Sequence, residues 1–275
     1  MLLVTVTKVE SLAVLTAFEQ HTGQQPRLKT RRDQTFHDLG MVNGARVWLV
    51  LSEMGAGGLG GAQQAVAKGI EAIQPAAVIM VGIAFGVDAK WQKIGDILVA
   101  ENLRLYDLQR VGTDARKLQI VLRGARPDSS RRLLGTCKNA ELHWQGATVR
   151  FGCVLTGDKL VDNLDFRAQL RAFEPEAIGG EMEGAGLYAA CQDKKVDWLL
   201  VKAICDWADG EKEVDRKPRQ ELAARNAAEF VLHTLKTVPL IGSADSHPRS
   251  PQTGPSTGKG IAASTVNIAG DVHFH

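Results

Sequence analysis

The chain has 275 residues, a formal net charge of +2 and an apolar fraction of 44%. This length and composition are typical of a globular protein with one large domain, or one domain plus extra segments. The small net charge argues against a nucleic-acid-binding or membrane-surface protein, and no stretch is long and apolar enough to span a membrane.

Apolar runs alternate with helical patterns along the first 240 residues. The β-branched run at 2–7 and the wholly apolar run at 76–86 are typical of buried strands, whereas the spacing at 219–236 predicts an amphipathic helix. This alternation predicts an α/β fold: a single three-layer domain with a mainly parallel, mixed central sheet flanked by helices. In chain order, we expect a strand at 2–7, a helix at 10–21, a strand at 45–55, a helix at 59–73, strands at 76–86, 94–103 and 148–158, a helix at 183–194, a strand at 197–209 and a helix at 219–236.

The composition changes near Gly242. Residues 241–262 are rich in Gly, Ser, Pro and Thr, which is typical of a flexible linker. Residues 263–275 alternate apolar and polar side chains and form a short β-prone segment. Because a solitary strand is unstable in water, this segment is expected to pair with its own sheet, with identical tails or with a partner protein. The sequence therefore predicts a globular domain at 1–240, a linker and an interaction segment.

The cysteines and the N-terminus indicate a cytoplasmic protein. The N-terminal residues lack the basic leader and long apolar run of a signal peptide. The cysteines form no CxxC pair, which argues against a zinc site or a disulfide framework and favours reduced thiols. The four cysteines are Cys137, Cys153, Cys191 and Cys205.

Carboxylates follow several of the predicted strands. Glu10 comes shortly after the first strand, Asp206 lies near the end of the last one, and Glu181 and Glu183 stand where the helix at 183–194 begins. In open α/β sheets, ligands bind beyond the carboxyl ends of the strands. Glu10, Glu183 and Asp206 are therefore expected to meet in one pocket.

Each of these acids also has a purely structural interpretation. Glu10 suits a solvated first helical turn, Glu181 and Glu183 suit the free N–H groups of a helix N-terminus, and Asp206 suits a loop cap. The glycine-rich segment 55–61 fits a tight strand-to-helix turn as well as a phosphate-binding loop. It lacks the features of a nucleotide P-loop and of a dinucleotide-binding motif.

Seven segments, in this order, resemble the nucleoside phosphorylase and nucleosidase superfamily, and most closely its methylthioadenosine/S-adenosylhomocysteine nucleosidase branch. The resemblance covers about residues 1–238. The combination of EMEG at 181–184 with ICDWAD at 204–209 is specific, whereas the glycine motifs alone are not. The segments are TVTKVESLAV, SEMGAGGLGGAQQA, PAAVIMVGIAFGVD, IGDILVAENLRLYD, CVLTGDKLV, GGEMEGAGLYAA and VKAICDWADGEK.

The resemblance implies a purine N-glycosidase and a role for each acid. Glu183 would accept hydrogen bonds from the ribose hydroxyls, Met182 would pack on the sugar, and Glu181 would support the site from behind. Asp206 would protonate the departing base, and Glu10 would hold the attacking water. This chemistry requires no metal and no organic cofactor. Further contacts with the substrate are expected from Ile83, Ala84, Leu160 and Val161.

Three positions depart from the family pattern, and all of them concern the base. Cys205 replaces the usual serine before the aspartate, Leu160 stands where an aromatic side chain commonly stacks on the base, and Phe85 replaces a glycine. The sugar-binding residues match the family while the base pocket differs. Methylthioadenosine, adenosylhomocysteine, adenosine and adenosine nucleotides such as ATP therefore all stay open as substrates.

Water is favoured over phosphate as the nucleophile. Phosphorylases of this superfamily place an arginine on the third strand, where this chain has Met80. A phosphate dianion without a nearby guanidinium would be poorly compensated, and Glu10 would repel it. The alternatives are a phosphorolytic enzyme, a nucleotide-sensing module that no longer cleaves, and a structural or interaction protein.

The resemblance also bears on partners. Enzymes of this superfamily usually form dimers or larger homo-oligomers, and the segment 263–275 is similar to C-terminal motifs on nucleosidase-like effectors of bacterial immune systems. This implies recruitment or assembly through the tail and a role in defence. A basic stretch at 27–32 has two interpretations, a solvated surface or a site for the phosphates of a nucleotide.

Overall fold

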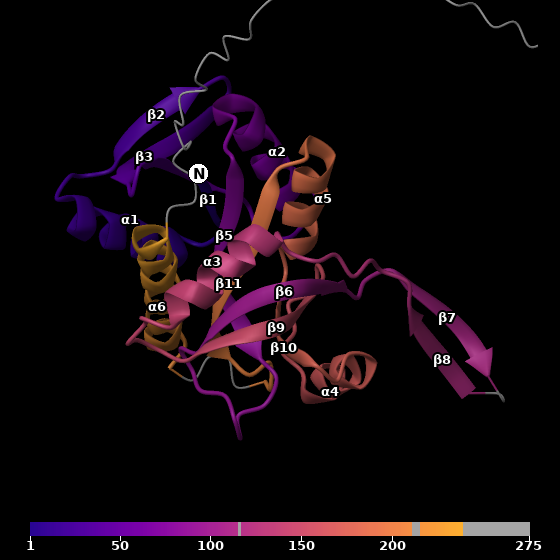
Figure 1. The fold of residues 1–275 in the computed structure, drawn as a ribbon. Helices are drawn as coiled ribbons and strands as arrows, with labels where there is room; N and C mark the ends of the chain where they lie inside the picture. Colours follow the sequence, from indigo (N-terminus) through magenta and orange to yellow (C-terminus); the bar gives the residue numbers. More distant parts are fainter. Residues whose placement is uncertain (115–116, 211–214, 239–275) are drawn as a thin grey trace, which may run out of the picture. The chain divides into compact units, whose positions relative to one another are not determined.

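The computed structural model describes residues 1–114, 117–210 and 215–238 (Figure 1). These residues belong to one compact unit, Met1–Gly242. The predicted linker and the predicted interaction segment at 263–275 lie outside the described residues.

A mixed sheet of nine strands forms the centre of this unit. Its order is β10-β9-β6-β11-β5-β1-β4-β3-β2, with parallel pairing around β1, β5 and β11 and an antiparallel β2-β3-β4 meander at one edge. Parallel strands at the centre place several carboxyl ends side by side. The strands are β1 (Leu2–Thr5), β2 (Arg27–Arg31), β3 (Gln34–Val42), β4 (Ala45–Leu51), β5 (Ala77–Gly86), β6 (Ile97–Leu105), β9 (Val149–Thr156), β10 (Ala177–Glu181) and β11 (Asp197–Asp206).

The sheet curls back on itself where β10 pairs with β5. Gly179 lies opposite Gly86, and Gly180 lies opposite Phe85, in antiparallel register. A Cβ atom on Gly180 would stand 2.3 Å from the Phe85 ring, so this approach requires glycine. The closure brings the ends of β5, β10 and β11 around one point.

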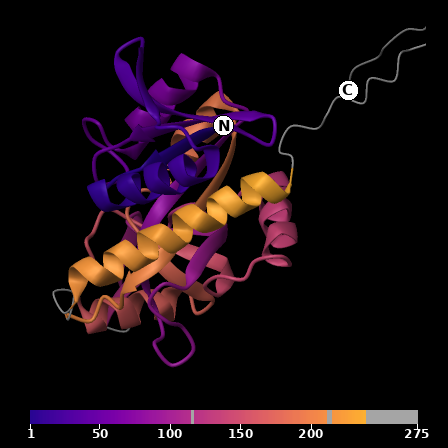
Figure 2. The same cartoon turned by 90° about the vertical axis from the view of Figure 1, so that its left-hand side faces the viewer.

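Helices cover both faces of the sheet, which confirms the predicted three-layer α/β architecture. Side chains of α1, α3 and α6 pack with one face, and side chains of α2 and α5 pack with the other. Figure 2 shows α6, in orange to yellow, lying alongside α1, in indigo. None of the helices in the described ranges is both long and apolar enough to cross a membrane. The helices are α1 (Lys8–Thr22), α2 (Ala62–Ile73), α3 (Arg131–Glu141), α4 (Leu164–Phe173), α5 (Gly184–Lys194) and α6 (Arg216–Thr237).

Several elements were not predicted from the sequence. The edge strand β2 is almost wholly polar, so it carries no apolar alternation. A separate hairpin, β7 (Gln109–Asp114) with β8 (Lys117–Leu122), extends from the end of β6 (Figure 1). The prediction that Glu181 stands at the start of a helix is wrong, because Glu181 is the last residue of β10. The elements missed were β2, β3, β7, β8, β10, α3 and α4.

Candidate active site

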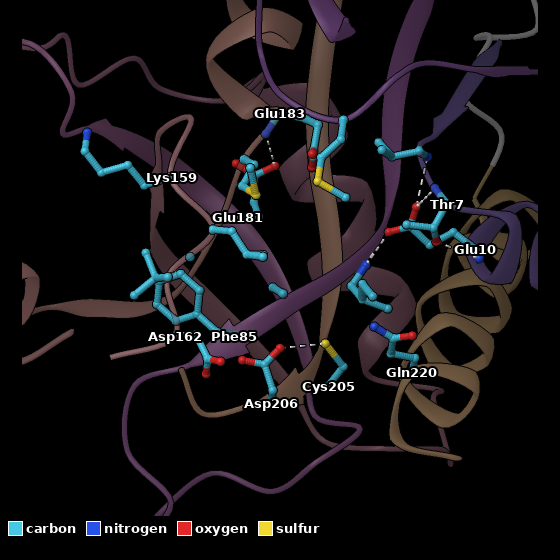
Figure 3. Close-up of a pocket in the computed structure, with 18 of the residues that line it drawn as sticks. Thr7, Glu10, Phe85, Lys159, Asp162, Glu181, Glu183, Cys205, Asp206 and Gln220 are labelled. Carbon is cyan, nitrogen blue, oxygen red and sulfur yellow. Dashed lines mark hydrogen bonds between the residues drawn. The ribbon is translucent and has the colours of Figure 1, made fainter. Parts of the chain in front are cut away.

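A cavity of about 410 Å³ opens beyond the carboxyl ends of β1, β5, β10 and β11, where α/β sheets commonly bind ligands (Figure 3). Its volume lies within the range of small-molecule sites. The structure brings all the residues singled out from the sequence to this cavity. They are Glu10, Ile83, Ala84, Leu160, Val161, Glu181, Met182, Glu183 and Asp206.

Glu10 is held rigidly at the floor of the cavity. It is only 2% exposed, and it belongs to a capping box at the start of α1, so the solvated interpretation is wrong. One carboxylate oxygen accepts hydrogen bonds from the backbone N–H groups of Val6 (2.9 Å) and Thr7 (2.7 Å). The other accepts one from Ile83 N (2.8 Å). Three backbone donors therefore fix the carboxylate between α1 and β5.

Glu183 is the N-cap residue of α5, and two distant segments hold its carboxylate. Oε1 accepts a hydrogen bond from Gly55 N (3.2 Å) in the glycine-rich loop after β4, and Oε2 accepts one from Lys202 Nζ (3.1 Å). Gly55 has a φ of 93°, a conformation that favours glycine. The backbone N–H of Gly55 in this loop thus positions the carboxylate of Glu183.

Glu181 lies behind Glu183 and bonds the backbone of its own turn. Its carboxylate accepts hydrogen bonds from Glu183 N (2.9 Å) and from Gly184 N (2.9 Å). The side chain is buried. These contacts orient the start of α5.

Lys202 is a central residue that sequence reasoning missed. It projects from the middle of β11, is 1% exposed, and its Nζ lies 3.1 Å from Glu183, 3.7 Å from Glu181 and 4.0 Å from Glu10. A lysine inside the apolar run WLLVKAIC was the available signal, because burying an unpaired ammonium is very costly. Lys202 is the common counter-ion of three acids from three different elements.

Burial and charge act in opposite directions on this cluster. Burial raises the pKa of Glu181 to about 7, although the Lys202 ammonium partly opposes that change. Burial by itself would lower the pKa of Lys202, but Glu183, Glu10 and Glu181 together raise it above its ordinary value. The ammonium therefore stays charged among carboxylates that outnumber it.

Gly82 makes room for this cluster. A Cβ atom on Gly82 would stand 2.1 Å from Glu10 Oε1 and 3.1 Å from Lys202 Nζ. The first contact is closer than nonbonded atoms allow, and the second is tight. The glycine in β5 is therefore required by the acids and the lysine next to it.

Asp206 ends β11 at a β-bulge, where the pairing with β5 shifts by one residue. Its Oδ1 accepts a hydrogen bond from Ala208 N (2.9 Å), and its Oδ2 accepts one from the Cys205 thiol (3.2 Å; Figure 3). Bulges re-aim side chains next to active sites. The thiol thus takes the place of the hydroxyl that the family pattern leads one to expect, as a weaker donor.

Apolar side chains cover the side of the cavity near Asp206. Phe85 and Val161 are buried, whereas Leu160 is 66% exposed. Lys159 also lines the cavity and pairs with Asp107. The residues that depart from the family pattern therefore lie together around Asp206.

The basic stretch at 27–32 lies elsewhere. Its residues belong to the edge strand β2 and the turn after it, and none of them lines the cavity. Lys29 pairs with Asp38 at 2.6 Å, Arg31 stacks over Trp48, and Arg32 pairs with Glu71. Within this chain, the solvated-surface interpretation is therefore the better one.

The fold and the site together define an α/β protein with a small-molecule cavity built around buried carboxylates. No group of three or more His, Cys, Asp or Glu side chains in the described residues is arranged to hold a metal ion. The family model of the phosphorylase superfamily matches residues 5–236. The chain belongs to this superfamily.

Sequence relatives agree with this assignment, and a solved structure shares the fold. The chain is 31% identical over 194 residues to a death domain-containing ATP nucleosidase of Amphimedon queenslandica, covering 63% of this chain but only 36% of that protein. It is 30% identical over 197 residues to the 5'-methylthioadenosine/S-adenosylhomocysteine nucleosidase of Haemophilus influenzae strain 86-028NP, covering 70% and 82% of the two chains. The Neisseria meningitidis nucleosidase of the same name, solved with methylthio-immucillin-A, shares the fold with a TM-score of 0.70 at 23% identity, over 86% of this chain and 99% of that one.

Proposed function

We propose that this chain hydrolyses the N-glycosidic bond of a purine nucleoside or nucleotide. The observation that carries the proposal is the convergence of Glu10, Glu183 and Asp206 in one cavity, each on a separate element of the sheet's carboxyl edge. The named nucleosidases among its relatives support the same reaction class.

In this proposal each acid has one task. Cleavage builds positive charge on the ribose and negative charge on the departing base. Glu183 accepts hydrogen bonds from the ribose hydroxyls and stabilises the positive charge. Asp206 donates a proton to a purine nitrogen as the bond from C1′ to the base breaks. A water oxygen bonds to C1′, and Glu10 takes the proton that this water loses.

Lys202 is a positioning residue in this scheme. With one ammonium among three carboxylates, the floor of the cavity carries no surplus positive charge. A phosphate dianion would be repelled there, whereas neutral water would not. Met80, at the position where phosphorylases carry an arginine, is fully buried in β5. Water is therefore the nucleophile.

One assay tests both the activity and the nucleophile. Purified protein is incubated with adenosine and with ATP in phosphate-free buffer, and the products are separated by chromatography. We expect free adenine with the unphosphorylated sugar from adenosine. Strict dependence on added phosphate, with ribose 1-phosphate as product, would favour the phosphorolytic alternative. Binding of either compound without release of base would favour the sensing module.

We also propose that the catalytic domain at 1–240 works in the cytoplasm as a homo-oligomer, and that the segment 263–275 controls its assembly or recruits it to a partner in bacterial defence. The motif similarity of the tail and its separation by a Gly/Ser/Pro/Thr-rich linker support this. Deleting the residues after Gly242 tests it, with mass and turnover measured on both proteins. Loss of assembly or recruitment with turnover retained is expected. Unchanged mass, turnover and partner binding would remove any such role from the tail.

A further inference from the structure

One wall of the cavity has a chemistry that hydrolysis does not use. Arg216 and Gln220 of α6 line this wall, together with Val6 and Thr7 at the start of α1. Arg216 and Gln220 are four residues apart and therefore lie on the same face of the helix. Figure 3 shows Gln220 on the side of Thr7 and Glu10, away from Lys159. Bond cleavage at C1′ requires no cation on this wall.

The acids fix the direction in which a nucleoside lies, if the proposed function holds. Glu183 and Met182 hold the ribose, and Asp206 meets the base on the side of Phe85 and Leu160. In a nucleoside the base is attached at C1′ and the 5′ carbon at C4′, on opposite sides of the ring oxygen. The 5′ substituent therefore points away from Asp206, toward the wall formed by α1 and α6.

We propose that Arg216, together with Gln220, binds the 5′-phosphate groups of the substrate, so that this enzyme acts on purine nucleotides in preference to neutral nucleosides. This inference rests on the proposed function. A guanidinium forms paired, charge-assisted hydrogen bonds with phosphate oxygens, and the glutamine amide adds a neutral donor. A neutral 5′ thioether offers no charged acceptor to a guanidinium.

Basic side chains gather at the start of α6. Arg216, Lys217 and Arg219 lie within four residues, and Asp215, the N-cap residue, directly precedes them. Arg216 itself is exposed at the rim. The outer phosphates of a di- or triphosphate would therefore extend into solvent, where they keep most of their hydration, while the nucleoside occupies the cavity.

The test compares kcat/KM for ATP and for adenosine in the full chain and in Arg216→Gln. We expect the ATP-to-adenosine ratio to fall about tenfold or more in the variant, because a charge-assisted pair is lost. Raising the ionic strength should lower the same ratio in the unmodified protein. Lys217→Gln is the matched control. It removes an equal charge from the same turn, but its side chain is 82% exposed, pairs with Glu221 and does not line the cavity. Its ratio should stay close to that of the unmodified protein.

The outcomes separate this inference from the proposed function. Release of adenine from adenosine but not from ATP would overturn the phosphate site and leave the hydrolase intact. An unchanged ATP-to-adenosine ratio in Arg216→Gln would also overturn the phosphate site. If Lys159→Gln lowered this ratio and Arg216→Gln did not, the phosphates would bind at the opposite wall. If neither compound released adenine, the proposed function itself would fail.

Discussion

The two sides of the cavity are built in different ways. Around the proposed ribose site, Glu10, Glu181 and Glu183 are buried, and each carboxylate takes backbone hydrogen bonds in addition to sharing Lys202. Around the proposed base site, Asp206 is partly exposed and accepts a hydrogen bond from a thiol. Leu160 beside it stands largely open to solvent.

This difference follows from the cost of burying charge. A carboxylate in a dry site must have partners, so every residue of the ribose site constrains its neighbours and few substitutions are tolerated. Apolar side chains on the base side make no directional contacts, and they can change without leaving a buried charge unpaired. We therefore expect the side around Lys202 to tolerate fewer substitutions than the side around Asp206.

Asp206→Asn is expected to have the largest effect, because Asp206 is the one group on the variable side that the chemistry requires. Loss of a positioned general acid should lower turnover about a hundredfold or more, with the fold intact. Turnover is measured by base release and folding by circular dichroism. Near-normal turnover would show that Asp206 is not the general acid, and that this side of the cavity only packs against the base.

Glu183→Gln tests the constrained side. Losing the charged acceptor should lower kcat about tenfold to a hundredfold, since hydrogen bonds to charged groups contribute about 1.5–3 kcal/mol. A 2′-deoxy substrate lacks one of the hydroxyls and should lose less than a ribose substrate. Equal losses on the two sugars would argue against direct contact between Glu183 and the ribose.

Gly82→Ala tests whether the acid cluster has any free space. The new methyl group would lie 2.1 Å from Glu10 Oε1. Overpacking of this kind costs about 1–3 kcal/mol, and displacement of Glu10 should also lower turnover about tenfold. Gly57→Ala, in the loop after β4, is a matched control because a Cβ there meets no atom within 4 Å. Equal stability in the two variants would mean that the cluster adjusts freely.

Glu181→Gln tests the electrostatics through pH. Because the folded-state pKa of Glu181 is raised from 4.5 to about 7, the folded chain keeps a proton that the unfolded chain loses in this window. Stability should therefore fall as pH rises from about 5 to about 8, by at most about 3 kcal/mol, and Glu181→Gln should lack this slope. Urea unfolding at both pH values measures it. An identical slope in the variant would assign the titration to another group.

Cys205→Ala should have the smallest effect. The thiol is a weak donor to Asp206, so its removal should change turnover only about threefold. Cys205→Ser should retain the contact with a stronger donor and keep at least the original turnover. A loss of a hundredfold in Cys205→Ala would show that the base side is as constrained as the ribose side.

The sequence alone determined the α/β class, the family and nine of the residues that line the cavity. The wholly apolar runs identify the buried strands, and the acids come directly after them. Because parallel strands bring their carboxyl ends together, these acids must lie close to one another. The polar edge strand β2 and the short strand β10 escaped detection because neither carries a clear hydrophobic period.

Only the tertiary structure decided which charges meet. Lys202 lies 192 positions along the chain from Glu10 (202 − 10), yet the pairing of β11 with β5 brings the two side chains within 4.0 Å. The same folding places Arg216 in the cavity and leaves the basic stretch at 27–32 on a distant edge. A charged residue within an apolar run shows that it needs an oppositely charged partner. Strand register and helix packing determine which residue that partner is, because electrostatic interactions depend on distance and burial.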